Sequence, residues 1–131
     1  MQTILNRRVP ATPMSLPTLR HATRDALVEA GVGCTLFDDS IAVALSEAVG
    51  NAIRHAYPGA AGEIDLVVVL DDLGILVMVS DRGVGFGHPP AQPGLGLGLT
   101  MIDQLSTTST IDSTSSGTTV VMRFALSDRL P

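Results

Sequence analysis

The sequence SEAVGNAIRHAY, residues 46–57, has the spacing of a helix with polar and ionisable side chains along one face. Glu47, Asn51 and His55 recur at four-residue intervals with Arg54 beside them, so a helix stacks these side chains along one side. The adjoining apolar surface comes from Ala44, Leu45, Ala48, Val49, Ala52 and Ile53. A carboxylate and a carboxamide one turn apart can contact the same small ligand, such as a hydrated metal ion and a nearby water. A solvated helix face has the same pattern, so the neighbouring segments must decide between the two.

The composition limits the classes of protein that fit. With 131 residues, 45% of them hydrophobic and 3% aromatic, we expect one domain with an aliphatic core. A formal net charge of -5 argues against nucleic acid and anionic membranes as ligands, and the absence of Lys excludes a P-loop. The single cysteine, Cys34, excludes an intramolecular disulfide and fits a reducing compartment. We find no apolar leader and no run of 18 apolar residues, so we expect a cytoplasmic protein without a membrane span.

Helical and strand patterns alternate along the rest of the chain. In chain order they predict a short edge strand within residues 1–17, a helix over Thr18–Ala30 closed by Gly31, a helix from an N-cap at Asp38, Asp39 or Ser40 to about Ala56, a hairpin of Ile64–Leu70 and Ile75–Val79, a helix at Thr100–Leu105, and strands at Thr107–Asp112 and Gly117–Leu126. The hairpin strands are almost continuously apolar at their centres, which indicates a sheet face covered by helices.

Two glycine-rich segments follow the hairpin. The first reads SDRGVGFG over residues 80–87 and places Asp81 at the end of a buried strand, just before glycines at alternate positions. The second reads GLGLGL over residues 94–99, so its backbone N–H groups and the following helix N-terminus can approach an anion. Neither matches GxGxxG, and either alone is a weak signal. Their order, after the helix of residues 46–57 and before Gly117-Thr118-Thr119, is much more specific.

In this order the motifs resemble the ATP-binding domain shared by gyrase, histidine kinases and the mismatch-repair protein MutL. Within that superfamily the chain is most similar to the stand-alone anti-sigma-factor serine/threonine kinases of bacteria. SEAVGNAIRHAY is similar to the N-box of that family, SDRGVGF to its first glycine box, GLGLGL to the second and SGTTV to the third. The resemblance covers about residues 16–126 of a single domain, residues 1–131. It implies an α/β two-layer sandwich in which helices pack on one face of a mixed, mostly antiparallel sheet, with ATP held between helices and a lid.

The resemblance also implies roles for individual residues. Asn51 matches the Mg²⁺ ligand, and Glu47 matches the catalytic residue that activates the attacking hydroxyl. Asp81 matches the carboxylate that accepts the hydrogen bond of the adenine N6 amino group, and Thr119 matches the hydroxyl beside the adenine. The remaining residues expected to bind the nucleotide belong to the glycine boxes: Gly83, Gly85, Gly94, Leu95, Gly96, Leu97 and Gly98.

Two features depart from the family pattern. These kinases usually carry an Arg at the second glycine box, where it can neutralise the transferring phosphate. Here residues 91–95 read AQPGL, and the lid over residues 87–94 is short. Arg54 and Arg82 are the candidates to take over that role, and His55 is a candidate hydrogen-bond donor or acceptor near the site.

The implied cofactors are ATP and Mg²⁺. The implied partners are a sigma factor, a small STAS-type anti-sigma-factor antagonist and a second copy of the chain in a homodimer. The main hypothesis is an anti-sigma factor that sequesters the sigma factor and phosphorylates a serine of the antagonist. Two alternatives stay open: a non-catalytic module whose ATP occupancy controls partner affinity, and a detached catalytic domain of a sensor histidine kinase.

Overall fold

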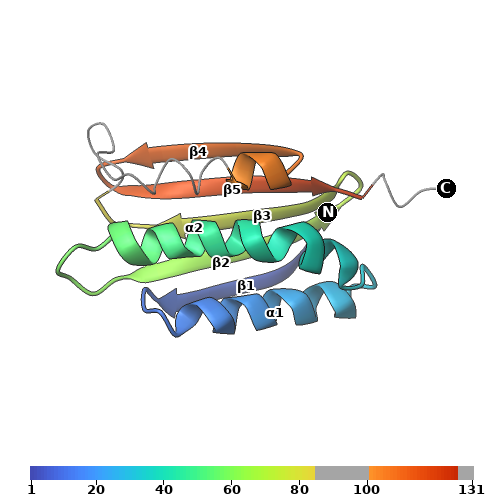
Figure 1. Ribbon diagram of the computed structural model, residues 1–131, viewed down its shortest axis with the longest axis horizontal. Helices are drawn as coiled ribbons and strands as arrows, with labels where there is room; N and C mark the ends of the chain where they lie inside the picture. The colour runs from blue at the N-terminus through green and yellow to red at the C-terminus, as the bar shows by residue number, and fades with distance from the viewer. Residues whose placement is uncertain (85–100, 127–131) are drawn as a thin grey trace.

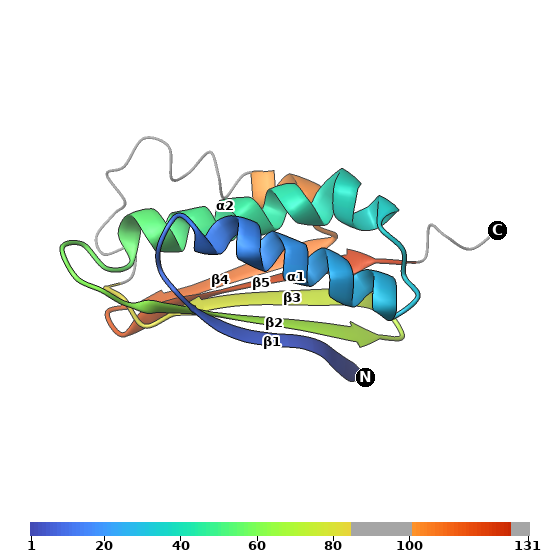
Figure 2. The ribbon, with the colours of Figure 1, turned by 90° about the horizontal axis from the view of Figure 1, so that it is seen from below.

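The computed structural model describes residues 1–84 and 101–126, which form two layers (Figure 1, Figure 2). One layer is a five-stranded sheet in the order β1-β2-β3-β5-β4. Its strands are β1 (Gln2–Pro10), β2 (Glu63–Asp71), β3 (Gly74–Asp81), β4 (Thr108–Thr114) and β5 (Gly117–Ala125). The other layer contains α1 (Ser15–Glu29), α2 (Ala42–His55) and a helical turn at residues 101–105, all on the same face of the sheet.

The predicted two-layer α/β fold is confirmed, with one difference in the sheet. Every pair of neighbouring strands in the described part of the chain is antiparallel, so the sheet is not mixed. Tight turns account for the β2–β3 and β4–β5 pairs. Between β1 and β2 the chain runs back along the sheet in α1 and forward again in α2. β2 therefore starts at the end of the sheet where β1 ends and runs antiparallel to it (Figure 1).

The N-terminal strand and the first helix match the predicted pattern with shifted boundaries. β1 is an edge strand, as expected, and it extends over 9 residues up to Pro10. α1 begins at Ser15 rather than Thr18, because Pro17 is tolerated in the first turn, where its missing N–H would have no helical acceptor. Gly31 closes the helix with a φ of 83°, and its N–H donates to the carbonyl of Val28.

The predicted N-cap of α2 is wrong. The chain is already helical at residue 35, and residues 38–40 lie inside a π-helical segment, η1 (Phe37–Ile41). This wider turn is closed by the N–H of Ala42, which donates to the carbonyl of Phe37. It buries both Phe37 and Ile41, at 5% and 0% exposure, whereas Asp38 and Asp39 face solvent. Packing of the two apolar side chains therefore overrides the capping preference of the polar residues.

The core lies between the helices and one face of the sheet. Figure 2 shows that the helices cover one face of the sheet and leave the other open. Burial alternates along β5: Thr118, Val120, Met122 and Phe124 are buried and face the helices, and the residues between them are partly buried on the open face. This period of two fixes which residues of each strand can contribute to a site beneath the helices. None of the helices described in residues 1–84 and 101–126 is long and apolar enough to cross a membrane.

Candidate nucleotide site

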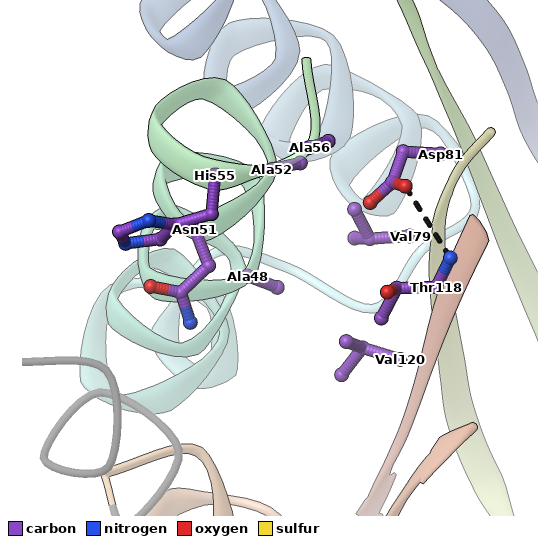
Figure 3. Close-up of a pocket in the computed structure, with 9 residues that line it drawn as sticks. All are labelled: Ala48, Asn51, Ala52, His55, Ala56, Val79, Asp81, Thr118 and Val120. Carbon is purple, nitrogen blue, oxygen red and sulfur yellow. Dashed lines mark hydrogen bonds between the residues drawn. The ribbon is translucent and has the colours of Figure 1, made fainter. Parts of the chain in front are cut away.

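A pocket lies between α2 and the ends of β3 and β5 (Figure 3). Its described lining consists of Ala48, Asn51, Ala52, His55 and Ala56 from the helix side, and Val79, Asp81, Thr118 and Val120 from the sheet. The three alanines recur every four residues, so they follow one line of the helix surface and keep that surface flat. With two valines opposite, the centre of the pocket is apolar.

Asp81 forms the polar group on the sheet side of the pocket. One oxygen, Oδ1, accepts hydrogen bonds from the N–H of Gly83 at 2.9 Å and the N–H of Thr118 at 3.3 Å. Figure 3 shows the second of these. Burial raises the pKa of this carboxyl above its ordinary value, and the two backbone hydrogen bonds oppose that shift. The other oxygen, Oδ2, has no hydrogen-bond partner among the described residues, so it can accept a hydrogen bond from an amino group of a ligand.

Asn51 forms the polar group on the helix side. Asn51 is only 4% exposed to solvent, and its Oδ1 accepts a hydrogen bond from Arg54 Nη2 at 2.9 Å. Its Nδ2 is buried and has no partner in the part of the chain that the structure describes. An unpaired buried amide is costly, by about 1–3 kcal/mol, and its presence points to a place where a polar ligand completes the site.

The residues at this end fit a Mg²⁺ ion bound together with phosphate. A carboxamide oxygen is a suitable ligand for Mg²⁺, which takes few protein ligands and fills its shell with phosphate oxygens and water. Arg54 would have to release Asn51 Oδ1 for that contact. Among the described residues there is no group of three or more His, Cys, Asp or Glu side chains able to hold a metal ion, so Asn51 would act with the nucleotide rather than within a protein cage.

Glu47 and His55 lie on the same helix face as Asn51. Glu47 is one turn earlier and partly buried, it does not line the pocket, and no hydrogen-bond partner for it is found within the described ranges. His55 does line the pocket, as the sequence suggested it could. Burial, with a smaller contribution from the positive charge of Arg54, lowers the pKa of His55, which favours the neutral imidazole.

The two arginines considered for phosphate neutralisation lie on different sides of the molecule. Arg54 contacts Asn51 and therefore lies at the end of the pocket where phosphate is expected. Arg82 instead has its Nη2 at 3.8 Å from Asp65 Oδ2, and Asp65 belongs to the open face of the sheet. Arg54 is thus the better placed of the two.

The structure does not bring Thr119 to the pocket. Its hydroxyl lies 3.3 Å from Ser80 Oγ on the open face of the sheet, whereas Thr118, one residue earlier, is buried and lines the pocket. The strand alternation could have revealed this, because Val120, Met122 and Phe124 continue the inward face from Thr118.

The glycine boxes are only partly described. Gly83 is buried against the end of α2, where a Cβ would overlap the carbonyl oxygen of Ala56. Its role in the structure is therefore close packing beside Asp81. Gly85, the lid at residues 87–94, and the segment containing Gly94, Leu95, Gly96, Leu97 and Gly98 lie outside the described residues.

Comparison with known proteins identifies the family. A family model described as "Histidine kinase-like ATPase domain" matches residues 9–124. The serine-protein kinase RsbW of Staphylococcus epidermidis is 31% identical over 97 residues, which cover 72% of this chain and 60% of the relative. The anti-sigma F factor of Clostridium acetobutylicum is 29% identical over 102 residues, which cover 67% of this chain and 71% of the relative.

Two solved structures are also similar. The RsbU and RsbW domains of Rv1364c from Mycobacterium tuberculosis match with a TM-score of 0.72 and 26% identity, over 92% of this chain and 31% of that chain. The histidine kinase domain of the blue-light activated kinase EL346 from Erythrobacter litoralis matches with a TM-score of 0.58 and 27% identity, over 68% of this chain and 44% of that chain. The present chain spans 60% of the length of the staphylococcal kinase. Because the family model extends over nearly the whole chain, the resemblance seen in the motifs is confirmed, and the chain belongs to the histidine kinase-like ATPase family.

Proposed function

We propose that this domain binds Mg-ATP between α2 and the β3–β5 edge of the pocket and works as a serine/threonine kinase and anti-sigma factor. One observation carries the proposal: a single apolar pocket has an incompletely paired carboxylate, Asp81, on one side and an incompletely paired carboxamide, Asn51, on the other. The adenine of ATP would donate its amino N–H to Asp81 and pack its flat ring against the apolar lining. The phosphates and their metal ion would bind at Asn51. The names of the relatives, serine-protein kinase and anti-sigma F factor, support the choice of activity.

At the adenine end, the residues have distinct tasks. Asp81 Oδ2 would accept the hydrogen bond of the N6 amino group, while the backbone hydrogen bonds to Oδ1 keep the carboxylate from rotating. The alanines of α2 and the valines of the strands would sandwich the ring and exclude water. The hydroxyl beside the ring would be that of Thr118, which already pairs with Ser113 Oγ at 2.8 Å and, as both donor and acceptor, can still take part in a further hydrogen bond.

At the phosphate end, α2 supplies the charged and polar groups. Asn51 would hold Mg²⁺ through Oδ1, and the ion, when bound, supplies positive charge that stabilises the transferring phosphate. Arg54, once it has left Asn51, would add a second positive charge in the place of the arginine that the second glycine box lacks. Glu47, one turn before Asn51, would accept the proton of the attacking serine hydroxyl, a contribution of about 10²- to 10⁴-fold in rate.

The partners belong to the same proposal. A sigma factor would be sequestered by the domain, and a STAS-type antagonist would present the serine to be phosphorylated. The cytoplasmic location and the homodimer expected from the sequence also remain proposals.

The decisive experiment is a phosphotransfer assay with purified chain, Mg-ATP and candidate antagonists. We expect an acid-stable phosphoserine on the antagonist, lost in Glu47→Gln while ATP binding remains. The matched control is Glu29→Gln, since Glu29 is an exposed carboxylate on α1. Normal ATP binding without phosphoserine would contradict the kinase assignment, and an acid-labile phosphohistidine would instead support the sensor-kinase alternative.

One observation favours a non-catalytic binding module as the second candidate. The Glu47 carboxylate has no group within the described residues to orient it, and a general base normally has its geometry fixed by a neighbour. In such a module, ATP occupancy alone would change the affinity for the sigma factor. A Glu47→Ala chain that retains full ATP-dependent sigma-factor binding would favour this candidate.

A further inference from the structure

Tyr57 connects three segments at the end of α2. Its hydroxyl donates a hydrogen bond to the carbonyl of Glu63, at the start of β2, at 2.6 Å. The same oxygen accepts a hydrogen bond from the N–H of Arg82, just after β3, at 2.9 Å. A phenol hydroxyl can donate and accept at once, so this one side chain links the start of β2 and the residue after β3 to the segment that follows α2.

The turn after Asp81 is held at three successive amides. The N–H of Arg82 donates to the Tyr57 hydroxyl, that of Gly83 to Asp81 Oδ1, and that of Val84 to the carbonyl of Ala56 at 2.9 Å. Two of the three acceptors therefore come from the end of α2. The path of residues 82–84 is held by contacts with Ala56 and Tyr57, and the Gly83 N–H within this turn is one of the two donors to the Asp81 carboxylate.

Close packing leaves this arrangement little freedom. A Cβ at Gly62 would overlap the ring of Tyr57, and a Cβ at Gly83 would overlap the main chain of Ala56. Both neighbouring segments thus press against the end of α2 where only glycine fits. The Tyr57 ring packs against Gly62, and its hydroxyl is held by the hydrogen bonds to Glu63 and from Arg82.

We propose that Tyr57 is a positioning residue for adenine recognition: its hydroxyl fixes the turn that aims Asp81 into the pocket. The inference rests on the proposed ATP-binding function and adds a residue that does not itself line the pocket. Because the Arg82–Tyr57 hydrogen bond lies at the exposed side of the turn, water can replace it. Loss of the hydroxyl therefore changes the order of the turn more than the stability of the fold.

The test compares Tyr57→Phe with wild type by calorimetric titration with ATP and with AMP. The variant keeps the ring that packs against Gly62 and loses only the hydroxyl. We expect both nucleotides to bind about 2- to 12-fold more weakly, by the same factor, because the change acts on the adenine end. Amide hydrogen exchange in the free protein should be faster at Arg82 and Gly83, and the urea midpoint should stay near that of wild type.

The control and a second variant make the test specific. Thr23→Val removes a buried hydroxyl that donates to the Leu19 carbonyl at 2.7 Å within α1, and it should leave nucleotide affinity unchanged. Gly62→Ala keeps the hydroxyl but displaces the ring, so it should weaken ATP and AMP alike. Wild-type affinity in Tyr57→Phe, or a loss confined to ATP, would overturn the inference. If wild type itself binds no ATP, the proposed function fails, while the exchange rates still show whether Tyr57 orders the turn.

Discussion

Asp81→Asn should separate nucleotide recognition from folding. The carboxamide can still accept the hydrogen bonds that Gly83 and Thr118 donate to Oδ1. Its NH₂ group, however, takes the place of Oδ2 and presents a donor to the adenine amino donor. A hydrogen bond to a charged group contributes about 1.5–3 kcal/mol, so ATP affinity should fall about 10- to 150-fold.

The same substitution should not destabilise the protein at neutral pH. Burial raises the pKa of Asp81 in the folded state above the ordinary 3.8 of the unfolded chain. Between these two values the folded state binds a proton that the unfolded state does not, so ionisation of Asp81 opposes folding as the pH rises through that window. A neutral amide removes this cost. We therefore expect Asp81→Asn to be at least as stable as wild type at pH 7, and its stability to depend less on pH just above 3.8.

The assay is calorimetric titration with ATP and with inosine triphosphate, alongside urea unfolding. Inosine carries a carbonyl acceptor where adenine carries the amino group, so wild type should prefer ATP and the variant should lose much of that preference. Asp112→Asn, at an exposed carboxylate on β4, is the matched control and should change neither property. Unchanged ATP affinity in Asp81→Asn, or equal losses for both nucleotides, would refute the assigned role.

Three further perturbations follow from the same structure. Arg54→Met removes a cation that, after burial, helps to lower the pKa of His55, so an NMR titration should show that pKa moving up toward 6.5. In wild type the unfolded chain binds a proton at His55 more readily than the folded protein does. Acidification below 6.5 should therefore destabilise the fold. Asp71→Asn should reduce stability at pH 7, because the N–H of Leu73 and the Arg123 guanidinium stabilise the Asp71 carboxylate and hold its pKa below 3.8. In urea unfolding, the difference in stability between wild type and variant should disappear as the pH falls through the lowered pKa. Gly83→Ala places a Cβ against the Ala56 carbonyl and should cost about 1–3 kcal/mol in urea unfolding, with weaker ATP binding as well.

Sequence patterns identified the parts of the site that lie within long, regular elements. The four-residue spacing of Glu47, Asn51 and His55 fixes their common helix face, and the apolar run before Asp81 places its carboxylate at the end of a buried strand. Both inferences need only the period of one element. The two-layer fold was implied by the resemblance of the ordered motifs to the ATP-binding family, whereas the apolar strand centres indicated only that helices cover one face of the sheet.

The sequence-based predictions differ from the structure where only contacts distant in the chain distinguish one residue from another. Thr118 and Thr119 are identical side chains, and a shift of one residue along a strand moves the hydroxyl to the opposite face. At the start of α2, local capping preference favoured residues 38–40, whereas the burial of Phe37 and Ile41 decided the structure. The hydrogen bond between Tyr57 and Arg82 joins residues 25 positions apart, and no local sequence pattern marks it.

The π-helical turn at Phe37–Ile41 affects how α2 tolerates changes in chain length. The turn accommodates one residue more than an α-helical turn would, upstream of the functional helix face. A one-residue deletion at its exposed aspartates can therefore be absorbed by a return to α-helical bonding, with Glu47 and Asn51 kept in place. A deletion after Ala42 has no such reserve and rotates one part of the helix by about 100° relative to the other. We therefore expect a one-residue deletion within this turn to preserve the functional helix face and one after Ala42 to disrupt it.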